Sequence, residues 1–212
     1  MLFYNVKVVN EKKFNQQIVV KLKIDIYLQK IGKINNSILK NLEKDLKKAL
    51  GTSINSIIIL PEIIDLRESD YVANKKQYNG SSIIKQLKSS NNKSNSSTTL
   101  GILDVDIFKS KLNFVFGIAT NPKHPFKDYP GSAIISVTRL RESFYNKPEQ
   151  MELFRTRILK EAVHEIGHTI GLKHCNNKCV MQFSVSLTYV DEKPLKFCND
   201  CKDILEDFTN RS

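Results

Sequence analysis

Three of the four histidines in this 212-residue chain fall within eleven consecutive residues, and their spacing restricts the fold more than any other feature. The segment reads AVHEIGHTIGLKHC from Ala162 to Cys175. His164 and His168 stand four apart, so on a helix they share one face, about 5–6 Å from each other. Two imidazoles at that separation can bind one zinc ion, at Zn–N distances of roughly 2.0–2.1 Å. The segment therefore predicts a helix that presents two metal ligands on one side.

Three further residues extend this pattern. Glu165 directly follows the first histidine, a position from which a carboxylate reaches a metal-bound water. Gly171 can adopt the left-handed backbone that ends a helix, and a turn there would bring back His174 as a third ligand. Three protein ligands leave the fourth zinc position for water or substrate. In the alternative interpretation, helix histidines merely cap or solvate a surface. The full spacing HExxHxxGxxH favours a catalytic zinc with Glu165 as general base.

Four cysteines form a second group, as a Cys-x3-Cys pair and a Cys-x2-Cys pair: Cys175, Cys179, Cys198 and Cys201. Two local pairs separated by a loop suit a tetrahedral four-thiolate zinc site. Four unrelated buried thiols, or a redox pair, are the alternatives. After Leu172 only 40 residues remain, a length at which a folded unit usually needs a metal or disulfide. We predict a closed, structural zinc that also fixes the preceding His174.

Composition excludes some classes of protein. The chain carries no apolar run near the roughly 20 residues of a membrane span and no basic signal-peptide start, so we expect a cytoplasmic protein without a membrane partner. The net charge of +11 has two interpretations, attraction to nucleic acid or a Lys-rich bias spread over solvated faces. Because the lysines are scattered and do not alternate with aromatic residues, we favour the bias and expect no nucleic-acid partner.

Hydrophobic periodicity predicts mixed α/β structure. The segment Ile18–Leu28 alternates like a strand, Asn36–Leu50 has an apolar helical face that ends at Gly51, and Ile54–Leu60 is a short apolar strand. Strand, helix and strand in this order predict a parallel crossover. By spacing alone, Leu100–Phe108 and Leu112–Ile118 form a hairpin.

The histidines lie on a long helix in this prediction. A further strand precedes it at Ala133–Leu140. Asn146 and Glu149 fit a capping box, which predicts that the helix begins near Asn146. The apolar side of this helix faces the sheet, and His164 and His168 fall opposite it, toward a cleft.

The chain resembles the metzincins, and more closely the archaemetzincin (archaelysin) family of zinc metallopeptidases. The resemblance rests on the extended histidine motif followed by Cys175, on Cys179-x-Met181, and on Cys198-x-x-Cys201. Upstream segments are also similar: Gln77-Tyr78, Leu100 to Asp106, Leu112 to Gly117, and Arg139-Leu140-Arg141. The likeness covers most of the chain.

This resemblance implies two zinc ions per chain, one catalytic on the three histidines and one structural on the four cysteines. It implies a methionine turn at Met181 below the metal. It also implies a metzincin-like fold of the α/β (α+β) class, in which a mixed, twisted five-stranded sheet carries an active-site helix and a backing helix. In metzincins the antiparallel edge strand lines the cleft and pairs with the last strand. We therefore assign Leu112–Ile118 to that edge, against the hairpin.

The function implied is zinc-dependent hydrolysis of peptide bonds, aminopeptidase-like on short peptides, by a monomer. We divide the chain into an N-terminal subdomain, residues 1–172, and a small zinc-bound C-terminal subdomain, residues 173–212. Some metzincins keep a tyrosine two residues after the methionine; here Phe183 stands there, so the group that stabilises the oxyanion is unassigned. The alternatives are a latent peptidase and a non-catalytic, zinc-ribbon-like module that binds nucleic acid or protein.

Overall fold

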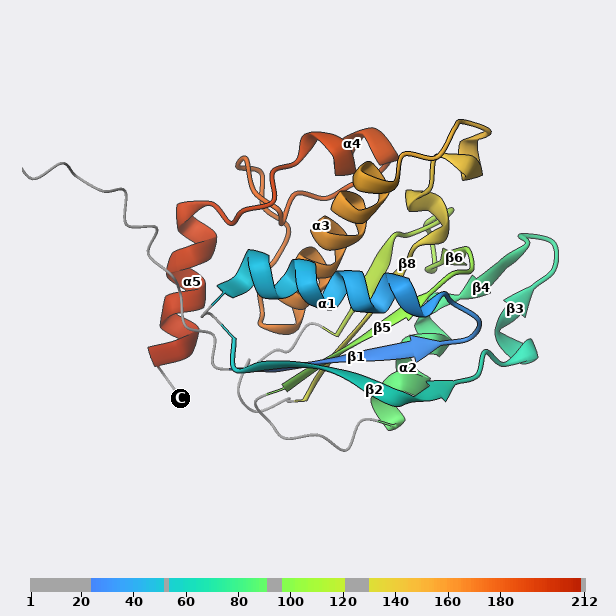
Figure 1. Cartoon of the computed structure of the whole chain (residues 1–212), viewed down its shortest axis with the longest axis horizontal. Helices are drawn as coiled ribbons and strands as arrows, with labels where there is room; N and C mark the ends of the chain where they lie inside the picture. The colour runs from blue at the N-terminus through green and yellow to red at the C-terminus, as the bar shows by residue number, and fades with distance from the viewer. Residues whose placement is uncertain (1–23, 52–53, 91–96, 121–129, 211–212) are drawn as a thin grey trace, which may run out of the picture.

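The fold is built on a twisted sheet whose edge borders the histidine motif. The computed structural model describes residues 24–51, 54–90, 97–120 and 130–210. In these ranges, five strands pair in the order β2-β1-β5-β8-β7 (Figure 1). The strands are β1 (Asp25–Ile31), β2 (Ser56–Ile64), β5 (Ser97–Leu103), β7 (Gly117–Ala119) and β8 (Gly131–Ser136). All neighbours are parallel except β7, which runs antiparallel to β8. The predicted mixed sheet is confirmed.

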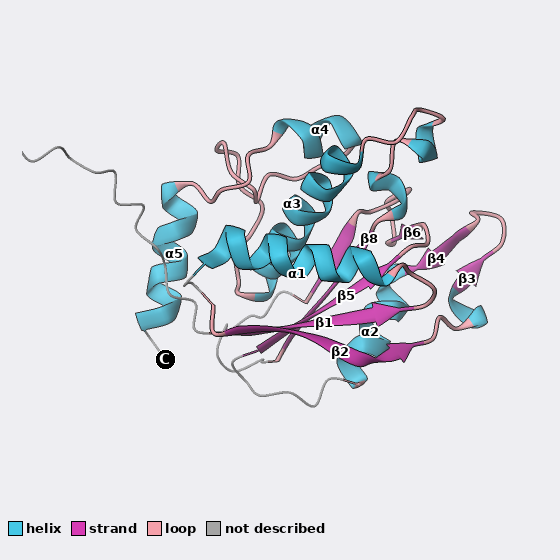
Figure 2. Cartoon of the chain, viewed as in Figure 1, coloured by secondary structure: helices cyan, strands magenta, loops and turns pink. Residues whose placement is uncertain are grey.

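Helices cover both faces of this sheet (Figure 2). On one face, α1 (Asn36–Leu50) packs against β1, β2 and the active-site helix α3 (Met151–Thr169). On the other face lies α2 (Gly80–Ser89). The bounds predicted for α1 are confirmed. Asn35 caps its first turn through the Ser37 N–H, and Gly51, at φ +52°, ends it.

Alternating residues of the central strands divide the core in two. Leu100, Ile102 and Ile135 point toward α1 and α3, whereas Leu103 and Ile134 point toward α2. This alternation is the period-two pattern expected of strands buried on both faces. The strand before α1 and the strand after it pair in parallel, which confirms the predicted crossover.

Two local predictions are wrong. The segment from 100 to 118 is not a hairpin, because β5 pairs with β1 and β8 while β7 pairs only with β8 in the described sheet. The edge strand is also shorter than predicted, since β7 begins at Gly117 rather than at Leu112. Between β5 and β7 the chain forms β6 (Ile107–Phe108), which joins β3 (Tyr71–Val72) and β4 (Gln77–Asn79) in a small second sheet. Long-range pairing overrides the local turn signal here.

The start of the active-site helix also differs from the prediction. Helix α3 begins at Met151, after Gln150 as cap residue. Asn146 instead adopts a left-handed φ of +58°, and the Glu149 carboxylate accepts the Ser143 N–H, six residues upstream. Pro148 explains the difference, because a proline disfavours helical backbone at the residue before it.

The C-terminal part packs on the same core as the sheet. It contains α4 (Leu187–Glu192) and α5 (Asn199–Asn210). Val180, Val190 and Leu205 are buried in the cluster that contains α1, α3 and the strands. The division at residue 172 stays a prediction. In the described ranges, no helix combines the length and apolar character needed to cross a membrane.

Candidate active site and second metal centre

Helix α3 places His164 and His168 one turn apart, as the four-residue spacing predicts. Their Nε2 atoms lie 3.1 Å from each other. The His164 Nδ1–H donates to the Val180 carbonyl at 2.9 Å, and the His168 Nδ1–H donates to the Leu172 carbonyl at 2.8 Å. A carbonyl only accepts, so these bonds put the proton on Nδ1 and leave the Nε2 lone pairs directed at one point. Metal-binding histidines commonly have such carbonyl partners.

Gly171 brings the third histidine into this group. Its φ of +94° is a left-handed backbone angle, and the Leu172 N–H bonds back to the Gly167 carbonyl at 3.0 Å. The chain then returns, so that the His174 ring centre lies 4.9 Å from that of His168 and 5.4 Å from that of His164. One nitrogen from each of the three rings falls within 4.8 Å of the others. The structure thus gathers the three predicted histidines, and their role as ligands stays a prediction.

Burial holds these imidazoles neutral. It lowers the pKa of His164 from 6.5 to about 2 and that of His168 to about 4. Burial also lowers the pKa of His174, which is more exposed, and the positive charge of Lys193 lowers it further. Unprotonated imidazole is the form that binds a metal, so the cluster is ready for one at neutral pH.

Glu165 lies in the same cleft and is 5% exposed. Burial raises its pKa well above the ordinary value, and the nearby Glu161 carboxylate raises it further. Gly117 on the edge strand makes room for this side chain: a Cβ added there would lie 2.5 Å from Glu165 Oε1. The absence of a side chain at Gly117 therefore lets the carboxylate pack against β7.

A cleft of about 430 Å³ opens beside the histidines. Residues 112–119, which end in β7, form one wall, and Phe183, Ser184 and Val185 form part of the other. The Phe183 ring packs 4.7 Å from the His174 ring, centre to centre. The volume falls in the range of sites that bind small ligands or short peptide segments.

Met181 packs against the active-site helix, and its role as the methionine turn stays a prediction. It is fully buried, and its sulfur would be 2.6 Å from a Cβ added to Gly167, between the two helix histidines. The Cys175 N–H donates to the Met181 carbonyl at 3.0 Å. Gly167 thus permits the methionine to approach the helix backbone directly below the histidine cluster.

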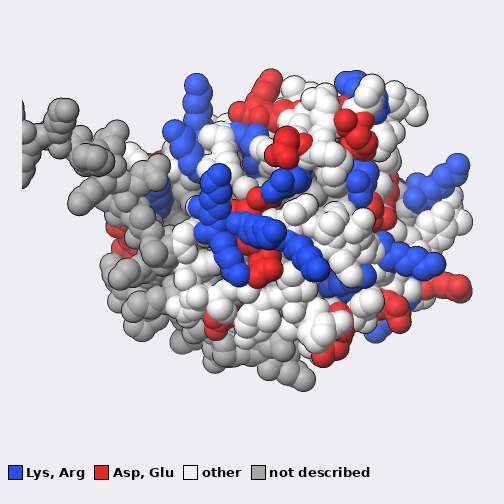
Figure 3. All heavy atoms as spheres, viewed as in Figure 1, with Lys and Arg blue, Asp and Glu red and all other residues white. Residues whose placement is uncertain are grey.

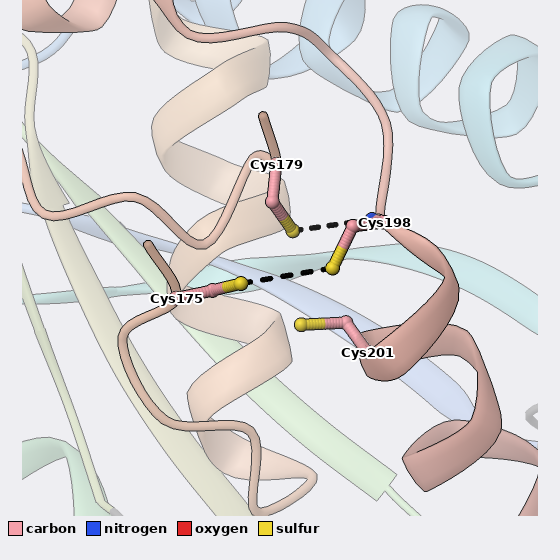
Figure 4. Close-up of side chains that lie close together, drawn as sticks. All are labelled: Cys175, Cys179, Cys198 and Cys201. Carbon is pink, nitrogen blue, oxygen red and sulfur yellow. Dashed lines mark hydrogen bonds between the residues drawn. The ribbon is translucent and has the colours of Figure 1, made fainter. Parts of the chain in front are cut away.

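The four cysteines point toward one another beside α5 (Figure 4). Their sulfur atoms all lie within 4.8 Å of one another, and the Cys175 and Cys198 sulfurs are 3.6 Å apart. Backbone N–H groups of Cys198 and Met181 donate to the Cys179 sulfur at 3.3 and 3.5 Å. Burial raises the pKa of the Cys175 and Cys201 thiols, whereas hydrogen bonds from the Cys201 backbone and Asn177 outweigh burial at Cys198 and lower its pKa to about 7.

Both groups fit zinc by the chemistry of their donors. Tetrahedral zinc with Zn–S bonds of roughly 2.3 Å separates its sulfur ligands by roughly 3.8 Å, and the observed sulfur separations are compatible with this value. In the described part of the chain, these are the sets of three or more His, Cys, Asp or Glu that could hold a metal ion. One set has four donors and the other has three.

Comparison with known proteins identifies the family. The model of Peptidase family M54 matches residues 16–207, most of the chain. The chain belongs to peptidase family M54. It is 39% identical to the archaemetzincin of Methanocaldococcus jannaschii over 183 residues, which cover 86% of this chain and 93% of that protein. It is 37% identical to the archaemetzincin of Archaeoglobus fulgidus, over 83% of this chain and 95% of that one. This M54 chain is therefore a zinc metallopeptidase, as the motif resemblance implied.

Solved structures agree with this fold. The archaemetzincin of Archaeoglobus fulgidus in complex with malonate superimposes with a TM-score of 0.67 at 35% identity, over 85% of this chain and 99% of that one. The archaemetzincin of Methanopyrus kandleri gives a TM-score of 0.71 at 30% identity, over 90% and 97% of the two chains. The predicted metzincin-like architecture is confirmed.

Several residues that shape the cleft are not predicted by the sequence motifs. A glycine within a strand, such as Gly117, is compatible with many structural roles. The spacing of Glu161, four residues before Glu165, does indicate that both lie on the face of α3 that lines the cleft. Its partner Lys193 sits in a polar run and reads as a solvated surface lysine, yet it is 1% exposed.

Proposed function

We propose that the chain hydrolyses peptide bonds at the histidine cluster, with Glu165 as general base. The observation that carries this proposal is the convergence of three imidazole nitrogens within 4.8 Å beside a buried carboxylate in one cleft. His164, His168 and His174 would hold a zinc ion. When bound, zinc supplies a Lewis acid that activates water and polarises the scissile carbonyl.

Glu165 performs the proton transfers in this proposal. Its carboxylate accepts a proton from the attacking water and then donates it to the leaving amine. A raised pKa suits both steps, because a carboxylate in this environment holds and releases a proton closer to neutral pH. Contact with the Gly117 backbone on one side and burial on the other restrict its motion.

Short peptides are the substrates that the cleft suits best. The edge strand β7 pairs with β8 on one side, and its residues line the cleft on the other. An extended peptide can add to such an edge through backbone hydrogen bonds. The cleft volume of about 430 Å³ supports short peptides, including aminopeptidase-like cleavage.

The cysteine cluster is proposed to hold a second, structural zinc. Four thiolates would complete a tetrahedral shell and leave no position for substrate. The cluster ties the segment after His174 to α5, so it would fix the position of the third histidine.

We propose a peptide rather than nucleic acid as the partner. Figure 3 shows basic side chains over α1, with acidic ones among them. Glu43 pairs with Lys47, and Asp45 pairs with Arg155, so part of this charge is balanced locally. The cytoplasmic location and the monomeric state stay predictions, and sedimentation of the purified protein would test the second.

Replacement of the base tests the mechanism. We expect Glu165→Gln to lower kcat/KM on cleaved peptides by at least about 10²-fold, the typical contribution of a general base. Zinc content and melting temperature should stay near those of wild type. Glu152→Gln is the matched control, because this carboxylate is also on α3 but its side chain is 88% exposed; it should keep full activity. Undiminished turnover by Glu165→Gln would contradict the mechanism.

A further inference from the structure

A buried ion pair lies behind the cleft. Glu161 of α3 and Lys193, just after α4, bring Oε1 and Nζ within 2.7 Å, and the two side chains are 4% and 1% exposed. Apart from this contact, neither atom has a hydrogen-bond partner in the described part of the chain. Burial of two charges costs free energy that a single contact offsets only in part. The pair therefore needs an explanation beyond packing.

The pair of Glu161 and Lys193 is not needed to hold α4 against α3. Two other basic residues of α3 already hold that helix. Arg157 bonds both carboxylate oxygens of Asp191, at 2.6 and 2.7 Å. The Lys160 ammonium donates to the carbonyls of Val190 and Asp191, at 3.0 and 2.7 Å. These contacts satisfy the end of α4 through several hydrogen bonds, whereas the Lys193 ammonium contacts only the Glu161 carboxylate in the described residues.

The two members of the pair lie at different depths. Glu161 is one of the residues that line the cleft, together with His164 and Glu165. Lys193 is not a lining residue, and its ammonium contacts the Glu161 carboxylate. Of the two residues, the one that carries the carboxylate thus borders the cleft, although its side chain is only 4% exposed. A carboxylate can accept up to about four hydrogen bonds, so contact with Lys193 leaves it able to accept others.

The position of Glu161 along α3 indicates which part of a bound peptide would lie near its carboxylate. Four residues of helix separate it from Glu165, a rise of about 6 Å. An extended peptide advances about 3.3 Å per residue, so this distance corresponds to about two residues of substrate. For a peptide that runs along α3, a side chain close to the scissile bond would therefore come near Glu161 when the bond lies at Glu165.

We propose that Glu161, backed by Lys193, selects peptides with a basic side chain close to the cleaved bond. The inference rests on the proposed hydrolysis at the histidine cluster. Lysine or arginine would donate to the Glu161 carboxylate, while an acidic side chain would be repelled. Lys193 is a positioning residue that supplies the counter-charge for a carboxylate at this depth. The substrate class is thus short basic peptides.

Binding measurements separate this selectivity from turnover. The zinc-loaded Glu165→Gln protein is titrated by calorimetry with pentapeptides that carry lysine, norleucine or glutamate at each position in turn, in an alanine background. Norleucine matches the length of lysine without its charge. We expect one position at which the lysine peptide binds about tenfold more tightly than the norleucine peptide, as a charged hydrogen bond provides, and at which the glutamate peptide binds most weakly. Equal affinity for lysine and norleucine at every position would overturn the proposal.

Variants of the pair assign the effect to these residues. Glu161→Leu with Lys193→Met replaces both charges by apolar groups of similar size, an exchange that buried ion pairs often tolerate. It should abolish the preference for lysine. Glu161→Gln, which keeps the shape, should weaken the preference if the double variant does not fold. Asp45→Leu with Arg155→Met removes another ion pair of α3, away from the cleft, and should preserve the preference. A preference for lysine that survives in Glu161→Gln would overturn the assignment.

Turnover is then compared in the wild type with the same peptides. Selective binding without hydrolysis would contradict the proposed function and leave the selectivity intact. Hydrolysis of lysine, norleucine and glutamate peptides with equal kcat/KM would contradict the selectivity alone.

Discussion

The histidine and cysteine clusters adjoin in sequence, at His174 and Cys175, but differ in what surrounds them. The histidine nitrogens border a cleft, and His174 is exposed. The cysteine sulfurs do not line that cleft in the described structure; Cys179 and Cys201 are buried, and backbone N–H groups donate to the Cys179 sulfur. Three donors beside open space suit chemistry, whereas four donors, which complete a tetrahedral shell, suit stability. The segment after α3 contributes a residue to each cluster, His174 to one and Cys175 to the other. The cysteine cluster can therefore hold His174 in position at the histidine cluster.

Loss of the cysteine cluster should have the largest effect. Cys179→Ser with Cys201→Ser removes two buried sulfur donors. Structural zinc contributes apparent binding free energies of about 10–16 kcal/mol in small domains, so we expect residues 175–210 to lose their fold. Amide hydrogen exchange should become fast there while the strands of the sheet stay protected. Activity should also vanish, because His174 loses its support. Unchanged protection of α5 would show that this cluster does not stabilise the C-terminal part.

A side chain that crowds Glu165 should have the next largest effect. It should lower activity at the histidine cluster and leave the cysteine cluster unchanged. A Cβ at position 117 would meet Glu165 Oε1 at 2.5 Å, so Gly117→Ala displaces the carboxylate. We expect kcat/KM to fall by about 10²-fold, because small misplacements of reacting groups have costs of this order. Gly51→Ala is the control for activity: its added Cβ meets nothing within 4 Å, although the φ of +52° strains any side chain there and is expected to lower stability. Full activity in Gly117→Ala would contradict the assigned position of Glu165.

The number of protons released when zinc binds should also differ between the histidine and cysteine clusters, although this effect is smaller than the loss of fold or activity above. The imidazoles of His164 and His168 have pKa values of about 2 and 4, so they bind no protons at pH 7.5 and release none to a metal. Burial raises the pKa of the Cys175 and Cys201 thiols above 9.0, so both carry protons that zinc must displace. Calorimetric titration of metal-free protein in buffers of different ionisation enthalpy should show release of at least about two protons for the cysteine cluster and at most about one, from a metal-bound water, for the histidine cluster. Equal release at both would contradict the environments described.

Local signals in the sequence were sufficient for helix α1, whose hydrogen bonds are local. The bounds of α1 follow from Asn35, Gly51 and an apolar face, and the histidine spacing places its side chains correctly on α3. The hairpin at 100–118 failed because strand partners are chosen by long-range packing, which put β8 between β5 and β7. The resemblance to archaemetzincins, rather than periodicity, gave the correct edge strand.

Motif spacing indicates which donors lie close together, and the structure gathers both predicted sets. Their role as zinc ligands stays a prediction. The surroundings of the site were not predictable in the same way. The Val180 carbonyl behind His164, the contact of Glu165 with Gly117, and the pairing of Glu161 with Lys193 all join residues that are far apart in the chain. Such contacts depend on how the segment after α3 folds back, and no local pattern specifies that path.

The count of bound zinc tests the central claim most directly. Elemental analysis of the purified wild type should give two zinc ions per chain. His164→Ala with His168→Ala should give one and stay folded, and Cys179→Ser with Cys201→Ser should lose the other. A wild-type chain that binds a single zinc, retained when both helix histidines are replaced, would contradict a metal at the histidine cluster and with it the proposed peptidase mechanism.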